Sequence, residues 1–545
     1  MTAVRLAIIP RPLRVTELPD TAGVTLDEGV IISYAPGLEA EARWFSSTLQ
    51  AGTGWLVATA EAGAPCDGRI ELRLGDLGGS AADLPAATRA EAYWLRSADG
   101  RLVITSPGRA GVFYGLQTLR QLLPDSVLQP SPAPSCSTQA ASSGPIELPA
   151  LEIVDGPRFP WRGVHLDVAR HFMPKSFVLK LIDLAAFHKC NVLHLHLTDD
   201  QGWRLPVAGY PRLTEIGGRR SQPDAADAEA LPSSGSGLDD GFYSPDDLAE
   251  IVAFAAERHV NVLPEVDMPG HMVAAIAAYP ELGGSAEPLS VWTSWGISTH
   301  VLNLNEGTLG FCADVIDAVV RTFPWDYIHL GGDECPTSEW ESSPRALALM
   351  REHGYTEARQ LQGWFTARVA EHLGTRGRTL VGWSEIIEGG APGNAIVMAW
   401  RSEDDLVSAA TAGHDVVATV QQWLYFDRPY SDDPAEPPSF PGAISVEKVY
   451  GFDPVPAAIP SDQCQHVLGA QCELWTEFVT TTEHAEYMYF PRLCAFAETV
   501  WTQTTATPPR SYAEFLPRLR RHLQRLEVLG VSYRPLDGPA RAPDA

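Results

Sequence analysis

The sequence predicts an α/β protein in which a (β/α)8 TIM barrel makes up most of the chain and follows a small α/β domain. Two observations lead to this prediction. Between residues 151 and 505, eight apolar runs of strand length alternate with segments of helical periodicity. Near-continuous apolar runs of this kind are typical of strands that are covered on both faces. Eight such repeats in about 350 residues match the size of a closed barrel.

The eight expected barrel strands have the following bounds in chain order: 163–170, 191–200, 260–270, 327–334, 379–386, 395–401, 415–420 and 466–477. The segment 177–188 after the first strand has apolar residues at helical spacing, which predicts a crossover helix. A second helix is expected after Ser244, because Ser244, Pro245 and Asp247 suit the N-cap, the first-turn proline and the third-position acid.

The first 150 residues predict a separate, smaller domain. Three strand-like runs precede one helical segment, at 69–74, 92–96, 101–105 and then 111–123. Residues 126–146 are rich in Pro, Ser and Ala without periodicity, which predicts a linker. We expect domains at 1–150 and 151–505, then a C-terminal helix and tail at 506–545 with the helix over 512–530. The acidic insert 220–241 is expected to be a surface loop.

Composition restricts the class of partner. Of the 545 residues, 68 are acidic and 40 basic, which gives a net charge of −28. Such a chain, without a local Lys/Arg cluster, repels phosphate backbones and anionic lipid, so neither nucleic acid nor a membrane is an expected partner. No export signal is recognisable at the N-terminus. We expect a cytoplasmic protein, or a secreted one if a leader has been removed, that is a monomer or a homodimer.

No metal or other cofactor is expected. Asp267 and His271 have ligand chemistry at a four-residue interval, but no third ligand completes a site. The GGDE segment at 331–334 has too few glycines for a phosphate-binding loop. The eight cysteines show no CxxC spacing, so we expect free thiols rather than disulfides or a zinc site.

Polar residues gather at the carboxyl end of almost every expected strand, which is where barrel enzymes have their active sites. They are Arg170, His171, Asp199, Asp200, Glu265, Asp267, His271, His329, Asp333, Glu334, Trp383, Glu385, Trp400, Arg401, Tyr425, Asp427, Trp475 and Glu477. Each alone suits a structural role such as a helix cap or a core residue. Carboxylates, an arginine and aromatic rings around one mouth together suit a carbohydrate, because flat rings cover the apolar face of a pyranose.

Asp333 and Glu334 are adjacent carboxylates just past a strand. Cleavage of a glycosidic bond needs an acid for the departing oxygen and a group that stabilises positive charge at the anomeric carbon. Neighbours in an extended segment point to opposite sides, so this pair is poorly placed to flank one bond. We therefore expect one of the two to be the acid while the other holds part of the substrate.

These residues resemble glycoside hydrolase family 20, the β-N-acetylhexosaminidases. The matching stretches follow the family order, at 157–174, 191–204, 263–271, 329–334, 382–386, 398–401, 425–427 and 474–477. Residues 91–123 also look like the small domain that precedes the barrel in this family. The resemblance implies a retaining exo-enzyme that removes terminal non-reducing GlcNAc, with GalNAc as an open alternative, from oligosaccharides such as chitooligosaccharides. In this family the 2-acetamido group of the substrate is the nucleophile, and an oxazolinium intermediate forms.

The resemblance also implies residue roles. Glu334 would be the general acid and then the base, Asp333 would accept a hydrogen bond from the acetamido N–H, and Tyr425 would donate to the acetamido oxygen. The implied sugar-binding residues are Arg170 at O3 and O4, Asp427 and Glu477 near O4 and O6, and the walls Trp383, Trp400 and Trp475. Asp199, Asp267 and His271 would form a surrounding layer that holds Glu334 in position.

Two other functions suit the same residues. One is a carbohydrate-binding barrel whose catalysis has lapsed, and the other is a conventional two-carboxylate retaining glycosidase with Glu265 or Asp267 as nucleophile. The sequence departs from the family pattern at Ser384, where many relatives carry Asp. Cys335, directly after the expected acid, suggests sensitivity to thiol reagents, with a packed thiol as the alternative.

Overall fold

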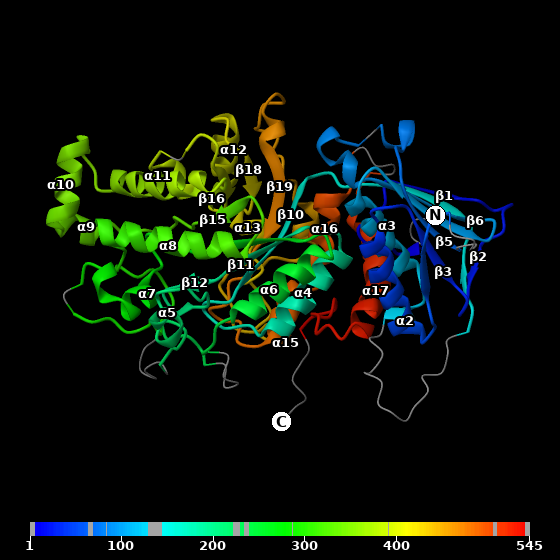
Figure 1. Ribbon diagram of the computed structural model, residues 1–545, viewed down its shortest axis with the longest axis horizontal. Coiled ribbons are helices and arrows are strands. Elements are labelled where there is room, and N and C mark those ends of the chain that lie inside the picture. The colour runs from blue at the N-terminus through cyan, green and yellow to red at the C-terminus, as the bar shows by residue number, and fades with distance from the viewer. Residues whose placement is uncertain are drawn as a thin grey trace.

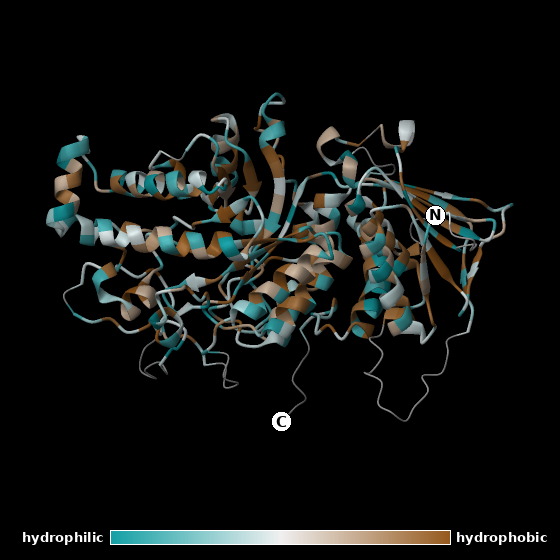
Figure 2. Cartoon of the chain, in the orientation of Figure 1, coloured by the Kyte–Doolittle hydropathy of each residue, from teal (hydrophilic) through white to brown (hydrophobic). Residues whose placement is uncertain are grey.

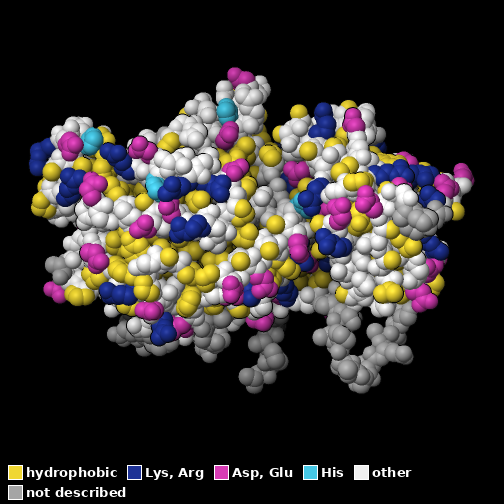
Figure 3. All heavy atoms as spheres, in the orientation of Figure 1, with side chains coloured by type: hydrophobic (Ala, Val, Ile, Leu, Met, Phe, Trp, Pro, Cys, Tyr) yellow, Lys and Arg dark blue, Asp and Glu magenta, His cyan; other side chains and the backbone are white. Residues whose placement is uncertain are grey.

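The computed structural model describes residues 6–63, 69–82, 84–128, 144–221, 229–233, 239–285, 287–390, 392–504 and 509–539. The barrel and the N-terminal domain lie side by side, with helices α16 (Arg492–Trp501) and α17 (Tyr512–Val528) between them (Figure 1). One hydrophobic cluster continues from Ile8 in the N-terminal domain through the barrel to Val531. On the face shown in Figure 3, acidic and basic side chains lie interspersed.

The predicted barrel is confirmed. Eight strands form a closed sheet in chain order, and every neighbouring pair is parallel. They are β10 (Trp161–Asp167), β11 (Val192–His196), β14 (Asn261–Glu265), β15 (Tyr327–His329), β16 (Thr379–Trp383), β17 (Ile396–Ala399), β18 (Val416–Ala418) and β19 (Val467–Cys472). Each strand falls within or overlaps its predicted run but ends earlier, because the polar residues at the carboxyl end leave the sheet and form the loops of the rim.

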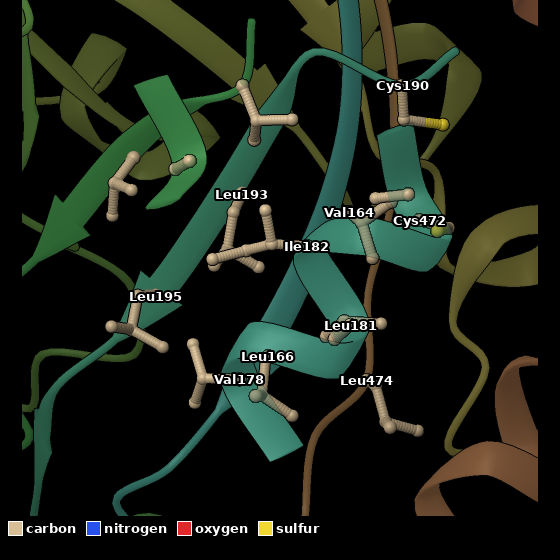
Figure 4. Packing of buried hydrophobic residues seen from close by; sticks show 14 of the residues in the cluster. Val164, Leu166, Val178, Leu181, Ile182, Cys190, Leu193, Leu195, Cys472 and Leu474 are labelled. Atoms are coloured by element: carbon tan, nitrogen blue, oxygen red, sulfur yellow. The ribbon is translucent and has the colours of Figure 1, made fainter. Parts of the chain in front are cut away.

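Helices cover the outside of the barrel with one apolar face each, as the brown and teal faces in Figure 2 show. The main ones are α4 (Lys175–Phe187), α6 (Pro245–Ala256), α8 (Glu306–Thr322), α11 (Gln360–Thr375), α12 (Glu403–Thr411) and α14 (Val446–Gly451). Figure 4 shows Val178, Leu181 and Ile182 of α4 packed on the side chains of β10 and β11. All three are buried, and each such burial stabilises the fold by roughly 1.5–3 kcal/mol.

The predicted start of α6 is also present. The Ser244 hydroxyl accepts a hydrogen bond from the backbone N–H of Asp247 at 3.1 Å, and the Asp247 carboxylate accepts one from the backbone N–H of Ser244 at 3.0 Å. This capping box satisfies two donors that the helix itself cannot pair. No helix in the described part of the chain is long and apolar enough to span a membrane.

The N-terminal domain is built on a seven-stranded sheet of order β1-β9-β6-β7-β5-β3-β4. These strands are β1 (Arg14–Glu17), β3 (Ile31–Tyr34), β4 (Ala58–Glu61), β5 (Ile70–Leu74), β6 (Tyr93–Ala98), β7 (Arg101–Ser106) and β9 (Leu151–Asp155), with helices α2 (Glu39–Thr53) and α3 (Arg109–Leu122). A separate pair consists of β2 (Val24–Leu26) and β8 (Ile146–Leu148). The early strands β1 to β4 were not predicted, because they are only three or four residues long.

The domain boundary predicted at residue 150 is too early. Strand β9 pairs antiparallel with both β1 and β6, so the N-terminal sheet continues through Asp155. Residues 151–155 fall within the predicted range of the barrel domain, because a short buried strand has no local mark of the sheet it joins. Most of the predicted linker, residues 129–143, lies outside the described residues, as do 222–228 and 234–238 of the predicted insert.

Candidate active site

A cavity of about 330 Å³ opens at the carboxyl end of the barrel strands. Eight of its twelve lining residues are among the predicted site residues: Arg170, Asp333, Glu334, Trp400, Tyr425, Asp427, Trp475 and Glu477. The other four are Gln421, Arg428, Phe440 and Pro441. The volume lies in the range of sites for small molecules. The barrel thus brings together polar residues that are up to 307 positions apart in the sequence.

Asp333 and Glu334 reach this cavity through a turn that follows β15. Gly331, Gly332 and Glu334 have φ values of +62°, +92° and +42°. The backbone is therefore bent here, and both carboxyl groups line the same cavity. The expectation that these neighbours point to opposite sides was wrong, because it assumed an extended segment. Only a glycine fits at 331, since a Cβ there would lie 1.9 Å from Oδ1 of Asp267.

Asp267 lies directly beneath Asp333. Oδ1 of Asp267 accepts the backbone N–H of Gly332 at 3.0 Å. Burial, with the charge of Glu265, raises the pKa of Asp267 to about 8, and burial, with the charge of Asp267, raises the pKa of Asp333 well above its usual value. Two close carboxylates resist double ionisation, so ionisation of one member of this pair makes ionisation of the other harder.

Asp199 connects the expected acid to the expected sugar-binding arginine. Its Oδ1 lies 3.2 Å from Nδ1 of His271, and its Oδ2 lies 2.9 Å from the guanidinium of Arg170. Nε2 of His271 in turn lies 3.7 Å from Oε2 of Glu334 and 3.8 Å from Oδ2 of Asp333. Although burial acts in the opposite direction, the Asp199 carboxylate raises the pKa of His271 well above its usual value. The His271 ring therefore faces both expected catalytic carboxyl groups, and its surroundings favour the protonated form of the ring.

The network continues into the barrel through His196, which was not among the predicted site residues, and through Glu265, Trp383 and His329, which were. Oδ2 of Asp199 lies 2.7 Å from Nε2 of His196, and Nδ1 of that ring lies 2.5 Å from Oε2 of Glu265. Oε1 of Glu265 accepts hydrogen bonds from Nε1 of Trp383 at 2.9 Å and faces Nδ1 of His329 at 2.8 Å. The alternation of His194 and His196 along one strand was the only available signal, because it places both on the same face.

These contacts argue against the conventional two-carboxylate mechanism. Glu265 is fully buried and both of its oxygens are engaged, while Asp267 is 1% exposed. Neither residue lines the cavity. A nucleophile must reach the anomeric carbon, and neither side chain is placed to do so.

Trp383 is not a wall of the cavity, contrary to the prediction. It is 1% exposed and lies beneath Trp475, with 5.8 Å between the ring centroids. Trp400 and Trp475 do line the cavity. The rings of Trp400 and Tyr425 are nearly parallel, 13° apart, with centroids at 6.1 Å. The sequence shows that a tryptophan ends β16, but the depth of its ring depends on strand tilt and on the bond to Glu265.

Several acceptor atoms in the cavity have no partner in the described part of the chain. They are Oδ1 of Asp333, Oδ1 of Asp427 and Oε2 of Glu477. A buried acceptor without a partner is costly, so these atoms are suited to N–H and O–H donors of a ligand. Burial raises the pKa of both Asp427 and Glu477 to about 7. Burial also raises the pKa of Tyr425 well above its usual value, which keeps its hydroxyl a donor.

Arg170 is held in place by several side chains, two of which, Glu477 and Trp475, also line the cavity. Its Nε donates to Gln201 at 3.0 Å, and one terminal nitrogen lies 3.1 Å from Asp167 and 3.6 Å from Glu477. The guanidinium lies 5.1 Å from the centre of the Trp475 ring. These contacts fix the orientation of a long side chain, which reduces the entropy lost when it binds a ligand.

The remaining predictions concern thiols and metal ligands. Six cysteines are described and all are free; Cys66 and Cys136 lie outside the described residues. Burial raises the pKa of Cys335, so this thiol remains protonated, which disfavours reaction with thiol reagents. Asp199, Asp200 and His271 are close enough to hold a metal ion, but Asp199 is already paired with Arg170 and with two histidines. Ser384 is buried, and nothing in the structure explains its departure from the family pattern.

The chain is similar to known proteins over nearly its whole length. The model of "Glycosyl hydrolase family 20, catalytic domain" matches residues 159–504, and that of "Glycosyl hydrolase family 20, domain 2" matches residues 5–156. A beta-N-acetylhexosaminidase of Cellulomonas fimi is 32% identical, with 99% of each chain covered. A beta-hexosaminidase of Porphyromonas gingivalis is 35% identical over 96% of this chain, and the match spans 64% of that protein's length.

Solved structures agree with the sequence matches. The GH20 beta-N-acetylhexosaminidase of Streptomyces coelicolor A3(2) has a TM-score of 0.79 and 30% identity, with 98% of this chain and 99% of that chain covered. The GH20 exo beta-N-acetylglucosaminidase of Vibrio harveyi in complex with N-acetylglucosamine has a TM-score of 0.80 and 30% identity, with 97% and 78% covered. The barrel, the preceding domain and the matches to both family models together show that the chain belongs to glycoside hydrolase family 20.

Proposed function

We propose that the protein is a retaining exo-β-N-acetylhexosaminidase that removes terminal GlcNAc from amino-sugar oligosaccharides. The observation that carries this proposal is the grouping of Asp333, Glu334 and Tyr425 around one cavity that neither of the candidate nucleophiles, Glu265 and Asp267, lines. The names of the family relatives, which include hexosaminidases and an enzyme with bound N-acetylglucosamine, support the same activity.

The first step breaks the glycosidic bond. The carbonyl oxygen of the 2-acetamido group attacks the anomeric carbon, and the electron pair of the bond passes to the leaving oxygen, which takes a proton from Glu334. Asp333 accepts the acetamido N–H and stabilises the positive charge of the oxazolinium, while the Tyr425 hydroxyl donates to the acetamido oxygen. In the second step Glu334 removes a proton from water, and the water oxygen attacks the same carbon. The bond between this carbon and the acetamido oxygen breaks, its electron pair returns to the acetamido group, and the original configuration is restored.

The walls of the cavity support an exo mode of action. Arg170, Asp427 and Glu477 lie together at one end of it, where they suit the O3, O4 and O6 hydroxyls of a terminal sugar. Trp400 and Trp475 offer flat faces to the ring. A chain that continued beyond O4 would have to pass these buried side chains, so this lining and the volume of about 330 Å³ favour one terminal residue.

A panel of chromogenic glycosides that differ only at C2 and C4 tests the proposal. We expect hydrolysis of the β-GlcNAc glycoside, little action on the β-glucoside, and inhibition by a thiazoline that mimics the cyclised intermediate. Equal rates on the GlcNAc and glucose compounds would contradict substrate assistance. The C4 epimer shows whether GalNAc is also accepted, and absence of all turnover would indicate a carbohydrate-binding barrel without catalysis.

Two variants test the residue roles. Glu334→Gln is expected to lower kcat by at least 100-fold, in line with the loss of a general acid. Asp333→Asn is expected to lower kcat more than it raises KM, because its hydrogen bond strengthens as charge develops. Glu306→Gln on the exposed end of α8 is the matched control, with unchanged rates expected. Wild-type kcat in either site variant would refute the assignment.

A further inference from the structure

A second and larger cavity, of about 800 Å³, lies on the other side of Glu334. Among the described residues, Glu334 is the one that lines both cavities. The wall of this second cavity comes from the segment after Glu334, from α9 (Ser338–Ser342) and α10 (Pro344–His353), from the start of α11, and from η5 (Ser384–Ile387) with Arg401.

The position of Glu334 determines what this cavity can hold. A general acid must contact the oxygen that joins the terminal sugar to its leaving group. If the terminal sugar occupies the cavity with Arg170, the leaving group extends past Glu334 into the larger cavity. Ile297 is 51% exposed and Leu347 is 36% exposed there. With Met350, they form an apolar surface on which a second pyranose ring can pack.

The polar part of this wall is rich in carboxyl groups. Glu334, Glu341, Glu357, Glu385 and Glu388 line it, against two guanidinium groups, Arg359 and Arg401. Both guanidinium groups already have carboxylate partners.

Arg401 lies 2.8 Å from Glu388 and 2.7 Å from Asp405, and Asp405 does not line the cavity. Arg359 lies 3.4 Å from Glu357 and 3.7 Å from Glu388. An anionic leaving group would therefore meet more carboxyl groups than guanidinium groups, and no unpaired cation, in the described wall. An amine would find the exposed carboxylate of Glu341, for which the structure gives no ion pair.

We propose that this cavity binds the leaving-group side of the substrate and selects it by charge. A glucosamine unit with a free amine is preferred to a neutral sugar, and a neutral sugar is preferred to one with a carboxylate or sulfate. This inference rests on the proposed function. It assigns the substrate class as partly deacetylated amino-sugar oligosaccharides in which the second unit is cationic.

Three matched aryl glycosides of β-GlcNAc test the charge selection. Their phenols carry p-aminomethyl, p-hydroxymethyl or p-carboxymethyl groups, in which a methylene separates the charge from the ring. We expect kcat/KM to fall in that order, by about three- to tenfold from cation to anion at low ionic strength, and the difference to shrink as salt screens it. The disaccharides GlcNAc-β-1,4-GlcN and GlcNAc-β-1,4-GlcNAc are expected to differ in the same direction.

Glu341→Gln/Glu357→Gln removes two exposed charges from the wall and is expected to reduce the ratio of kcat/KM between the cationic and the anionic compound to less than twofold. Glu306→Gln/Glu371→Gln, which removes two exposed charges from the outer surface of α8 and α11, is the matched control and should leave the preference intact. Equal kcat/KM for all three compounds, or a preference that survives in the first double variant, overturns the charge selection without affecting the proposed function. Absence of turnover with every compound overturns the proposed function itself.

Discussion

At the scale of single residues, the cavity is defined by acceptors that have no protein donor. Oδ1 of Asp427 and Oε2 of Glu477 are buried without partners in the described structure, and burial raises the pKa of each carboxyl to about 7. The fold therefore holds these groups in an unfavourable state that the hydroxyls of a sugar can relieve. Both carboxyl groups therefore titrate close to neutral pH, and we expect kcat/KM to vary with pH in this range.

Glu477→Gln tests this coupling. After burial, the charge of Glu477 is the next cause of the raised pKa of Asp427. Removal of a negative neighbour makes ionisation of Asp427 easier, so its pKa falls. We expect the transition near pH 7 in kcat/KM, which reports groups of the free enzyme, to move by about one pH unit toward acid. An unchanged pH profile would contradict this coupling between Glu477 and Asp427. Glu306→Gln, which removes an exposed charge outside both cavities, is the control.

At the scale of elements, the loop after β15 is the most constrained part of the site. The strand has only three residues, and two glycines with positive φ follow Leu330 at once. This turn brings the Asp333 and Glu334 side chains to one cavity and places the N–H of Gly332 on Asp267. The position of this turn and the position of the Asp267 and Asp333 carboxyl groups therefore depend on each other.

Gly331→Ala is expected to damage catalysis more than stability. The added Cβ would collide with Asp267 at 1.9 Å and displace the loop, and a misplacement of about 1 Å can lower kcat by about 100-fold. Gly413→Ala is the matched control: its φ is +88°, and a Cβ there meets nothing within 4 Å. Both variants bear a similar backbone strain of roughly 1–2 kcal/mol. We expect a much lower kcat for Gly331→Ala than for Gly413→Ala, and an equal kcat in the two variants would show that the loop after β15 can adapt.

At the scale of the whole molecule, Asp155 joins the N-terminal sheet to the barrel. It ends β9, and its carboxylate lies 2.8 Å from Nζ of Lys189, which follows α4. The same carboxylate accepts hydrogen bonds from the Tyr93 hydroxyl at 2.7 Å and from Nε1 of Trp501 at 3.0 Å. Lys189 and Asp155 are 0% and 1% exposed, so their pairing depends on both domains being in place.

Asp155→Ala is expected to lower the free energy of unfolding by about 3–5 kcal/mol, because it leaves the Lys189 ammonium buried without its counterion. Urea unfolding followed by tryptophan fluorescence measures this loss. Asp453→Ala provides the comparison: Asp453 pairs with Arg158 at 2.8 Å but is 45% exposed, and such a pair contributes less than about 1 kcal/mol. Similar losses for the two variants would refute a special role for Asp155.

Much of the site could be predicted because a barrel turns a local pattern into a spatial one. Arg170, Asp333, Tyr425 and Glu477 each follow an apolar run, and the carboxyl ends of parallel strands meet at one rim. The assignment of Trp383 to the wall failed, since the same local position suits a ring at the mouth or a ring beneath it. His196 was missed for a similar reason, because its partners Asp199 and Glu265 identify it only in three dimensions.

The sequence by itself determined the barrel, the domain that precedes it and the group of residues at the rim, because hydrophobic periodicity and the position of polar residues at strand ends are local properties. The tertiary structure decided where the N-terminal sheet ends, which rim residues contact the cavity, which carboxyl groups are buried beside one another and how the two cavities meet at Glu334. Those properties depend on burial and on distances between strands far apart in the chain, and no local pattern contains them.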